Sequence, residues 1–314
     1  MKKILYVALI LILTGIIGTL IIYQTTDTFH SAEVQPQKKT MLIDGVKDIK
    51  IDTSTVDVQV EKTDGRSLSA ELQGWGNKHV TQSIKLNVKK EGQILNINVG
   101  RKGPFISFTF GKMKLVVKVP DQLYDSVRAQ SASGDLSVRS LSAKQLSLAA
   151  DSGNVVSENN QAADRLSLQT TSGDITLKHT QIKNNAVVSA NSGDVVIDGL
   201  TAKSSQIETT AGEITVQNAT GNLAAQADSG DIQIKNDSLA GNISAETTSG
   251  NLNIDFAKKP ASFSLDYSGS SGMGTVQIDG LLYEEKTEHT LIGKKGSGAY
   301  QIRARTDSGD FSLK

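Results

Sequence analysis

The chain has 314 residues, no cysteine, and 33 basic against 33 acidic residues, so its formal net charge at pH 7 is zero. The absence of cysteine excludes disulfides, thiolate metal sites, cysteine nucleophiles and a lipid anchor attached to cysteine. The balanced charge gives no indication of a nucleic-acid partner, and we predict none.

The N-terminal region predicts a membrane anchor. Residues 4–23 carry no charge and are rich in Leu and Ile, a run long enough to span a bilayer as a helix. Lys2 and Lys3 precede it, so residues 1–3 are expected to form a cytoplasmic tip. A cleaved signal peptide is the alternative, but its apolar core is shorter and a small-x-small site should follow. The sequence therefore predicts a single-pass protein of the cytoplasmic membrane, anchored through residues 4–23, with an extracytoplasmic C-terminal domain.

The exterior part of the chain is predicted to be all-β. Residues 24–41 are polar and are interpreted as a tether to the folded domain. Residues 42–126 alternate apolar and polar positions, which predicts an N-terminal β region whose first, diverged coil turns at 52–55. No segment after Tyr23 shows a sustained helical period.

Residues 127–314 contain a repeated phrase, Ser-Gly-Asp or a close variant, at intervals of 18 to 20 residues before a longer final gap. A period near 20 is typical of a parallel β-solenoid, in which each repeat buries its apolar side against its neighbours. The glycines predicted to form the turns are Gly134, Gly153, Gly173, Gly193, Gly212, Gly230, Gly250 and Gly309.

Each repeat is predicted to contain two short strands on either side of its glycine. Around Gly173, the apolar positions Leu166 and Leu168 precede the turn and Ile175 and Leu177 follow it, with alternation of period two. We expect the glycine to supply a positive φ and the following Asp or Asn to cap the turn through its own backbone.

The repeat is obscured between Gly250 and Gly309, a gap of nearly three periods. Residues 262–265 and 274–278 are predicted to be strands of a degenerate coil. Residues 269–274 and 281–298 are predicted to be insertions or loops, and 266–298 as a whole is left without an assigned structure.

The candidate binding site is a basic segment between residues 101 and 118. Alternating Phe and Ser predict a hairpin there with Gly111 at its tip. Its cations would contact anionic lipid or a teichoic-acid-like wall polymer: Arg101, Lys102, Lys112, Lys114 and Lys118. The alternative is an edge hairpin whose lysines prevent aggregation.

The acids that follow the turn glycines offer two interpretations. They cap turns, or they form a carboxylate ladder that binds calcium. The calcium-binding β-roll uses paired glycines and a nine-residue period, and neither is present, so we predict no metal site and no cofactor. No catalytic motif stands out, so an enzyme acting on envelope glycans is the least favoured function.

The run 115–120, followed by Val127, Ala129 and the serial Ser-Gly-Asp phrases, resembles the bacterial putative-adhesin domain family. This resemblance implies an extracytoplasmic β-solenoid without established catalytic residues. The combination of one N-terminal anchor with this domain is similar to a member encoded with a cell-envelope-stress system in Bacillus-type, Gram-positive bacteria. It implies a role in the cell envelope. Our main hypothesis is a non-enzymatic interaction or scaffold surface, with envelope proteins or an anionic wall polymer as partners.

Overall fold

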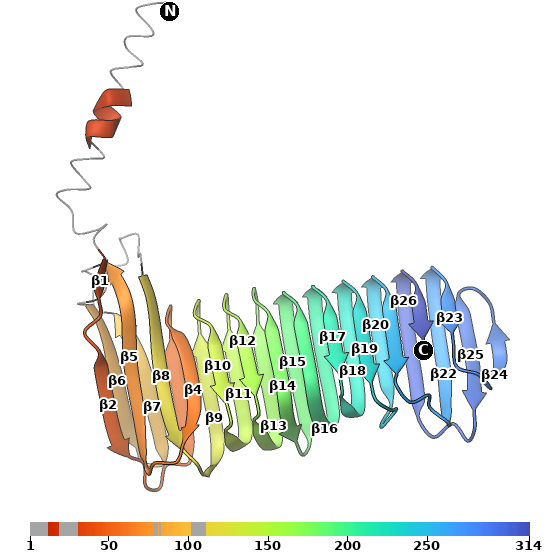
Figure 1. The fold of residues 1–314 in the computed structure, drawn as a ribbon, viewed down its shortest axis with the longest axis horizontal. Helices are drawn as coiled ribbons and strands as arrows, with labels where there is room; N and C mark the ends of the chain where they lie inside the picture. Colours follow the sequence, from red (N-terminus) through yellow and green to blue (C-terminus); the bar gives the residue numbers. More distant parts are fainter. Residues whose placement is uncertain (1–11, 19–30, 78–80, 82, 102–110) are drawn as a thin grey trace, which may run out of the picture.

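The computed structural model describes residues 12–18, 31–77, 81, 83–101 and 111–314, which apart from helical residues at 12–18, 81 and 83 are all-β. The strands stack into a long, straight array whose coils repeat across its length (Figure 1). The prediction of an all-β fold is confirmed, and the parallel pairing of successive repeats is that of a solenoid.

Two parallel faces, each with one strand from every coil, form this array. The first face contains, in spatial order, β7 (Ile94–Arg101), β3 (Asp48–Thr53), β9 (Leu123–Ser131), β11 (Ser142–Ala150), β13 (Gln161–Thr170), β15 (Asn185–Ser192), the second half of β16 (Val195–Ala211), β18 (Thr220–Ser229), β20 (Ile243–Ser249), β26 (Gln301–Ser308) and β22 (Phe263–Ser271). The second face contains β8 (Gly111–Pro120), β4 (Asp57–Thr63), β10 (Leu136–Arg139), β12 (Val155–Glu158), β14 (Ile175–Ile182), the first half of β16, β17 (Ile214–Gln217), β19 (Ile232–Asn236), β21 (Leu252–Phe256), β27 (Phe311–Leu313) and β23 (Gly274–Val276).

The core lies between the two faces and is built from the predicted apolar positions. Leu166, Leu168, Ile175 and Leu177 are fully buried, and the residues in register with them are mostly Leu, Ile, Val, Ala or Phe. Ser157 and Ser205 are buried exceptions within these ladders. Parallel strands about 4.8 Å apart place like residues above one another, so each coil removes its apolar surface from water only by stacking. The predicted inward positions are therefore confirmed.

Spatial order differs from chain order at both ends. The coil β3–β4 lies between β7–β8 and β9–β10, although β7 and β8 follow it in the chain. The coil β26–β27 is inserted between β20–β21 and β22–β23, so the last strands of the chain are internal (Figure 1).

Antiparallel strands cover the outermost coils. At one end β6 (Ile84–Glu91) pairs with β7, while β5 (Ser67–Asn77) pairs with β8 and in turn with β2 (Gln37–Leu42) and β1 (Ser31–Glu33). The side chain of Gln37 closes the corner, because it donates to the carbonyl of Ile84 and accepts from the amide of Leu86, both at 2.9 Å. Part of the predicted tether is therefore strand.

At the other end, β24 (Leu282–Lys286) and β25 (Thr290–Lys295) form an antiparallel hairpin that pairs with β22. The degenerate coil predicted at 262–265 and 274–278 corresponds to β22 and β23. Residues 281–298, predicted to be an insertion or a loop, contain this inserted hairpin between β23 and β26.

Of the predicted membrane-spanning helix over residues 4–23, the structure describes residues 12–18, which are helical. Residues 1–11 and 19–30 lie outside the described residues. Within the part of the chain that the structure describes, no helix is both long and apolar enough to cross a bilayer. This finding contradicts the predicted single-pass localisation in the cell membrane.

Candidate functional site

The turn glycines form a continuous file along one edge of the solenoid. A Cβ atom built on Gly193 would lie 2.0 Å from the carbonyl oxygen of Gly173, and one on Gly173 would lie 2.3 Å from that of Gly153. The same contact, at 2.0 to 2.2 Å, recurs at the other predicted turn glycines, Gly134, Gly153, Gly212, Gly230, Gly250 and Gly309, with Gly134 meeting Val56 instead of a glycine. Close approach between coils therefore explains the glycines.

The positive φ expected at these glycines is only part of the explanation. Gly230 and Gly309 have φ values of 145° and 146°, but Gly134, Gly153, Gly173 and Gly193 do not adopt a left-handed φ. What these glycines share with Gly230 and Gly309 is the close approach of their backbone to the preceding coil.

The glycine carbonyls are held by buried threonines. The hydroxyl of Thr170 donates to the carbonyl of Gly153 at 2.9 Å, and that of Thr209 to Gly193 at 3.0 Å. Thr247 and Thr306 make the same bond to Gly230 and Gly250. The sequence signal for this role is a Thr three residues before the glycine, which our sequence analysis did not use.

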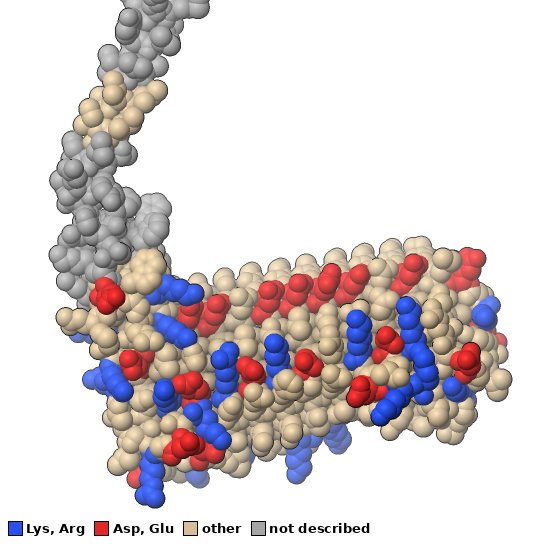
Figure 2. Space-filling model, in the orientation of Figure 1, with Lys and Arg blue, Asp and Glu red and all other residues tan. Residues whose placement is uncertain are grey.

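The acids after the glycines form a side-chain ladder between coils (Figure 2). Asp174 Oδ1 accepts a hydrogen bond from the amide of Asp194 at 2.9 Å, and Asp194 Oδ1 accepts one from the amide of Glu213 at 2.8 Å. Asn154 and Asn251 continue the ladder because an amide oxygen accepts the same bond. Each of these side chains thus accepts from a backbone amide of the next coil. We had expected it to bond the backbone of its own turn.

This ladder does not create a chelating site. One oxygen of each of Asp135, Asp174, Asp194 and Asp231 accepts from the backbone amide of the next coil, and the acids stand one strand spacing apart along the edge. Among the residues that the structure describes, no group of three or more His, Asp or Glu side chains could hold a metal ion.

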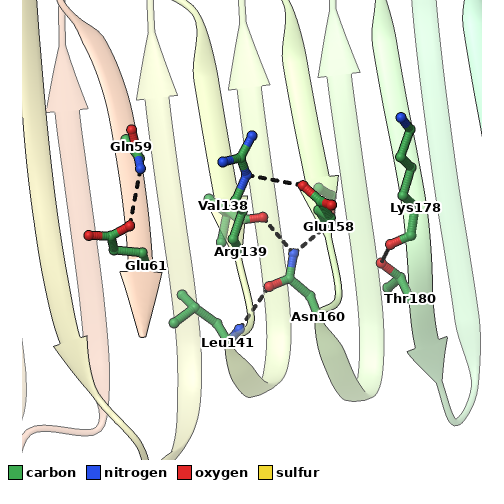
Figure 3. Close-up of polar contacts among 10 residues, drawn as sticks. Gln59, Glu61, Val138, Arg139, Leu141, Glu158, Asn160, Lys178 and Thr180 are labelled. Atoms are coloured by element: carbon green, nitrogen blue, oxygen red, sulfur yellow. Dashed lines mark hydrogen bonds and ion pairs between the residues drawn. The ribbon is translucent and has the colours of Figure 1, made fainter. Parts of the chain in front are cut away.

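A buried asparagine closes the corner on the opposite side of a coil (Figure 3). Asn160 is fully buried, and its Oδ1 accepts from the amide of Leu141 at 2.8 Å. Its Nδ2 donates to the carbonyl of Val138 and to the hydroxyl of Ser157, both at 2.9 Å. Asn236 repeats the first bond, to the amide of Ala219. These asparagines are structural, and sequence analysis did not single them out.

The predicted basic hairpin falls only partly within the described residues. Its second arm lies in β8, which pairs with β4 on one side and with β5 on the other. Residues 102–110, including Lys102, and the side chain of Arg101 lie outside the described residues. Lys112, Lys114 and Lys118 do share the outer side of β8, with Lys112 and Lys118 exposed and Lys114 half-buried.

Acids from a distant strand partly neutralise these lysines. Lys112 Nζ lies 3.8 Å from Asp57 and Lys118 Nζ lies 3.4 Å from Glu61, both on β4, and Lys114 is in register with Asp57. β8 lies more than 50 residues after β4. The sequence around these lysines therefore contained no sign of the acids that neutralise them. The surface of β8 is therefore of mixed charge.

Lys118 and Glu61 begin a row of alternating charge across the second face. Figure 3 shows its members from Glu61 to Lys178. The row continues through Arg139, Glu158, Lys178 and Asp198, each in register with the next. Arg139 Nε contacts Glu158 at 3.1 Å. Opposite charges placed directly across neighbouring strands favour this register, whereas like charges would oppose it.

Two shallow hollows lie where the chain returns from the second face to the first, and both are bordered by Leu123 and Ala163. They arise beside a β-bulge, because β13 has one residue more than β11 at Ala163-Asp164. In one hollow an ion pair of 2.6 Å joins Lys144 and Asp125, and its hydrogen bond lowers the pKa of Asp125 and raises the pKa of Lys144. The change of period from 19 to 20 residues is the sequence signal for this bulge.

Among the solved structures similar to this chain are two putative adhesins and a putative lipid binding protein. A putative adhesin from Parabacteroides distasonis is 19% identical, covers 70% of this chain and 96% of its own, and superposes with a TM-score of 0.46. A putative adhesin from Parabacteroides merdae is 17% identical, with coverages of 71% and 96% and a TM-score of 0.42. A putative lipid binding protein from Parabacteroides distasonis is 18% identical, with coverages of 71% and 97% and a TM-score of 0.39.

Curated proteins offer no sequence match to this chain. The family assignment comes instead from a sequence profile that matches residues 46–314, which contain every strand described above except β1 and β2. The predicted resemblance to a family of repeat β-proteins is thereby confirmed at the level of the family. The chain belongs to the Toastrack DUF4097 family.

Proposed function

We propose that this protein is a non-enzymatic interaction surface of the bacterial cell envelope, which acts as a scaffold for an envelope protein during the response to envelope stress. The observation that carries the proposal is the regularity of the second face. Its outward side chains repeat in register from coil to coil, and the charged ones compensate one another along a row. Such a face presents one extended, rigid surface in place of a single pocket.

The polar groups inside the fold support a structural use of the repeat. The buried Asn160, Thr170 and Thr209 all bond backbone groups of neighbouring coils. The outer surface is therefore the part of the repeat that is available for partners. Anionic lipid or wall polymer as the principal ligand is less well supported, because Lys112 and Lys118 already contact acids.

Site-specific photocrosslinking in intact cells tests this proposal. A photoreactive residue replaces Val196, which is 38% exposed at the centre of the second face, and in a matched variant it replaces Gln206, which is exposed on the first face. We expect one discrete crosslinked protein from position 196 and none from 206. Failure of position 196 to yield a product, with both variants folded and abundant, would rule out a scaffold role for this face.

A further inference from the structure

Trp75 is the only tryptophan of the chain, and 47% of it is exposed. It lies on the outer side of β5, where the inward positions Leu68, Ala70 and Leu72 of the same strand are fully buried. The core therefore does not use this indole. A large aromatic ring held on the outside of a rigid sheet is a feature that packing alone does not explain.

The backbone around Trp75 is tightly constrained. Trp75 is in register with Lys112 of β8 and with Glu33 of β1. A Cβ atom on Gly74 would lie 2.3 Å from the carbonyl oxygen of Lys112, and one on Gly111 would lie 2.5 Å from that of Trp75. The two strands approach too closely for side chains at these positions. The platform that carries the indole is consequently fixed before any ligand arrives, which reduces the entropic cost of binding.

Hydrogen-bonding side chains surround the ring. Gln73 lies on the same side of β5 as Trp75, two residues before it; it is exposed and lies opposite Lys114. The side chain of Lys112 is 76% exposed and that of Glu33 is in solvent on the other flank. One apolar plane with a few donors and acceptors at its edge is complementary to a sugar ring, whose C–H face stacks on an indole while its hydroxyls bond polar groups.

The local charges favour an uncharged ligand. Among the described residues of β1, β2, β4, β5 and β8 nearest the ring, three acids oppose three lysines: Glu33, Asp57 and Glu71 against Lys38, Lys112 and Lys114. Two of the acids are in ion pairs, at 3.8 Å each, with Lys38 and Lys112. Attraction to an anionic bilayer needs an excess of basic residues, and none is present among these described residues.

The size of the apolar surface also limits the occupant. A stable protein–protein interface buries about 800 Å² on each partner, whereas a whole tryptophan offers only about 150–250 Å². We infer that Trp75, with Gln73 and Lys112, forms a stacking site for a pyranose ring of an uncharged glycan. This inference deepens the proposed function, since it gives the envelope surface a second, saccharide partner at the opposite end from β24.

The single tryptophan makes the inference directly measurable. Fluorescence excited at the red edge of tyrosine absorption reports on Trp75 alone. The full chain is titrated with neutral hexasaccharides of N-acetylglucosamine, of glucose and of mannose. We expect a saturable blue shift with at least one of them. Isothermal titration calorimetry with that saccharide should then show a loss of affinity of about tenfold for Trp75→Ala, and smaller losses for Gln73→Ala and Lys112→Ala.

Tyr300→Ala is the matched control, because Tyr300 is an aromatic residue 39% exposed at the other end of the solenoid. It should bind as the unmodified protein does. No shift with any of the three hexasaccharides, or equal affinity in Trp75→Ala, would overturn the inference. A blue shift with anionic vesicles or with protein concentration alone would assign the ring to a bilayer or to a second copy and would equally overturn it. The crosslink from position 196 is independent of these results. Failure of the saccharide inference would therefore leave the scaffold proposal standing.

Discussion

Replacement of Gly193 by Ala tests whether close contact between coils, and not a left-handed backbone, selects glycine at the turns. The added Cβ would lie 2.0 Å from the carbonyl oxygen of Gly173 and 2.6 Å from its carbon. An ordinary carbon–oxygen contact is about 3.3 Å, so the coils must separate locally by about 1.3 Å. That is more than a quarter of the ~4.8 Å strand spacing.

Such a separation weakens the nearest bonds between the two coils. These are the bond from the amide of Ser192 to the carbonyl of Thr171, at 2.9 Å, and that from the amide of Asp194 to Asp174 Oδ1, at 2.9 Å. Each contributes about 1 kcal/mol, and overpacking adds about 1–3 kcal/mol. We expect Gly193→Ala to lower the free energy of unfolding by about 3–5 kcal/mol, measured as a lower urea midpoint at constant slope.

Two glycines of this chain serve as controls. Gly45 has a φ of +73° but no atom within 4 Å of an added Cβ, so Gly45→Ala carries only the conformational cost of about 1 kcal/mol. Gly100 has neither feature, and Gly100→Ala should change stability by less than about 0.5 kcal/mol. If Gly193→Ala cost no more than Gly45→Ala, the steric explanation of the glycine file would be refuted.

Three further predictions concern the interior and the second face. Asn160→Ala should lower the free energy of unfolding by about 3 kcal/mol, because it leaves the buried amide of Leu141 and carbonyl of Val138 unbonded. A urea midpoint equal to that of the unmodified protein would contradict this. Burial raises the pKa of Tyr124, whose hydroxyl donates to Pro120; its stabilising effect is therefore complete below the unfolded pKa of about 10 and is lost as pH rises above it. Urea midpoints measured upward from pH 9 should fall less steeply for Tyr124→Phe, and parallel curves would contradict the assignment. Arg139→Glu should lower the free energy of unfolding by about 1 kcal/mol at low salt and by less at high salt, since it places a third negative charge between Glu61 and Glu158. Lys203→Glu, at an exposed position outside this row, should not show this salt-dependent loss.

Local sequence pattern was sufficient for the parts of this fold that depend on neighbouring coils. The period of the turn phrase and the alternation around Gly173 correctly predicted two strands per coil and the inward residues, because each repeat carries its own apolar pattern. The lengthening of one period by a residue also coincides with the bulge at Ala163-Asp164.

The features that were missed depend on pairing between distant segments. Nothing local in residues 48–63 indicates that they lie between β7–β8 and β9–β10, so Asp57 and Glu61 could not be placed beside the lysines of β8. The role of glycine was predicted from backbone preference, whereas the structure adds a contact with the preceding coil. The alternation of Leu68, Ala70 and Leu72 places Trp75 on the outward side, but its neighbours on β8 and β1 are known only from the strand pairing.

The insertion of β26–β27 between two earlier coils has a consequence for the order of assembly during synthesis. Residues 263–295 leave the ribosome before β26 and β27, the strands that pair with β22 and β23 in the solenoid. Until residues 301–313 follow, both the edge of β20–β21 and that of β22–β23 offer unpaired backbone groups to any other strand. Elongation at the usual rate of about 5–20 residues per second makes this interval on the order of seconds. The nascent chain is thus most exposed to mispairing just before β26 and β27 emerge. These two strands then cover both open edges and join β22–β23 to the rest of the solenoid.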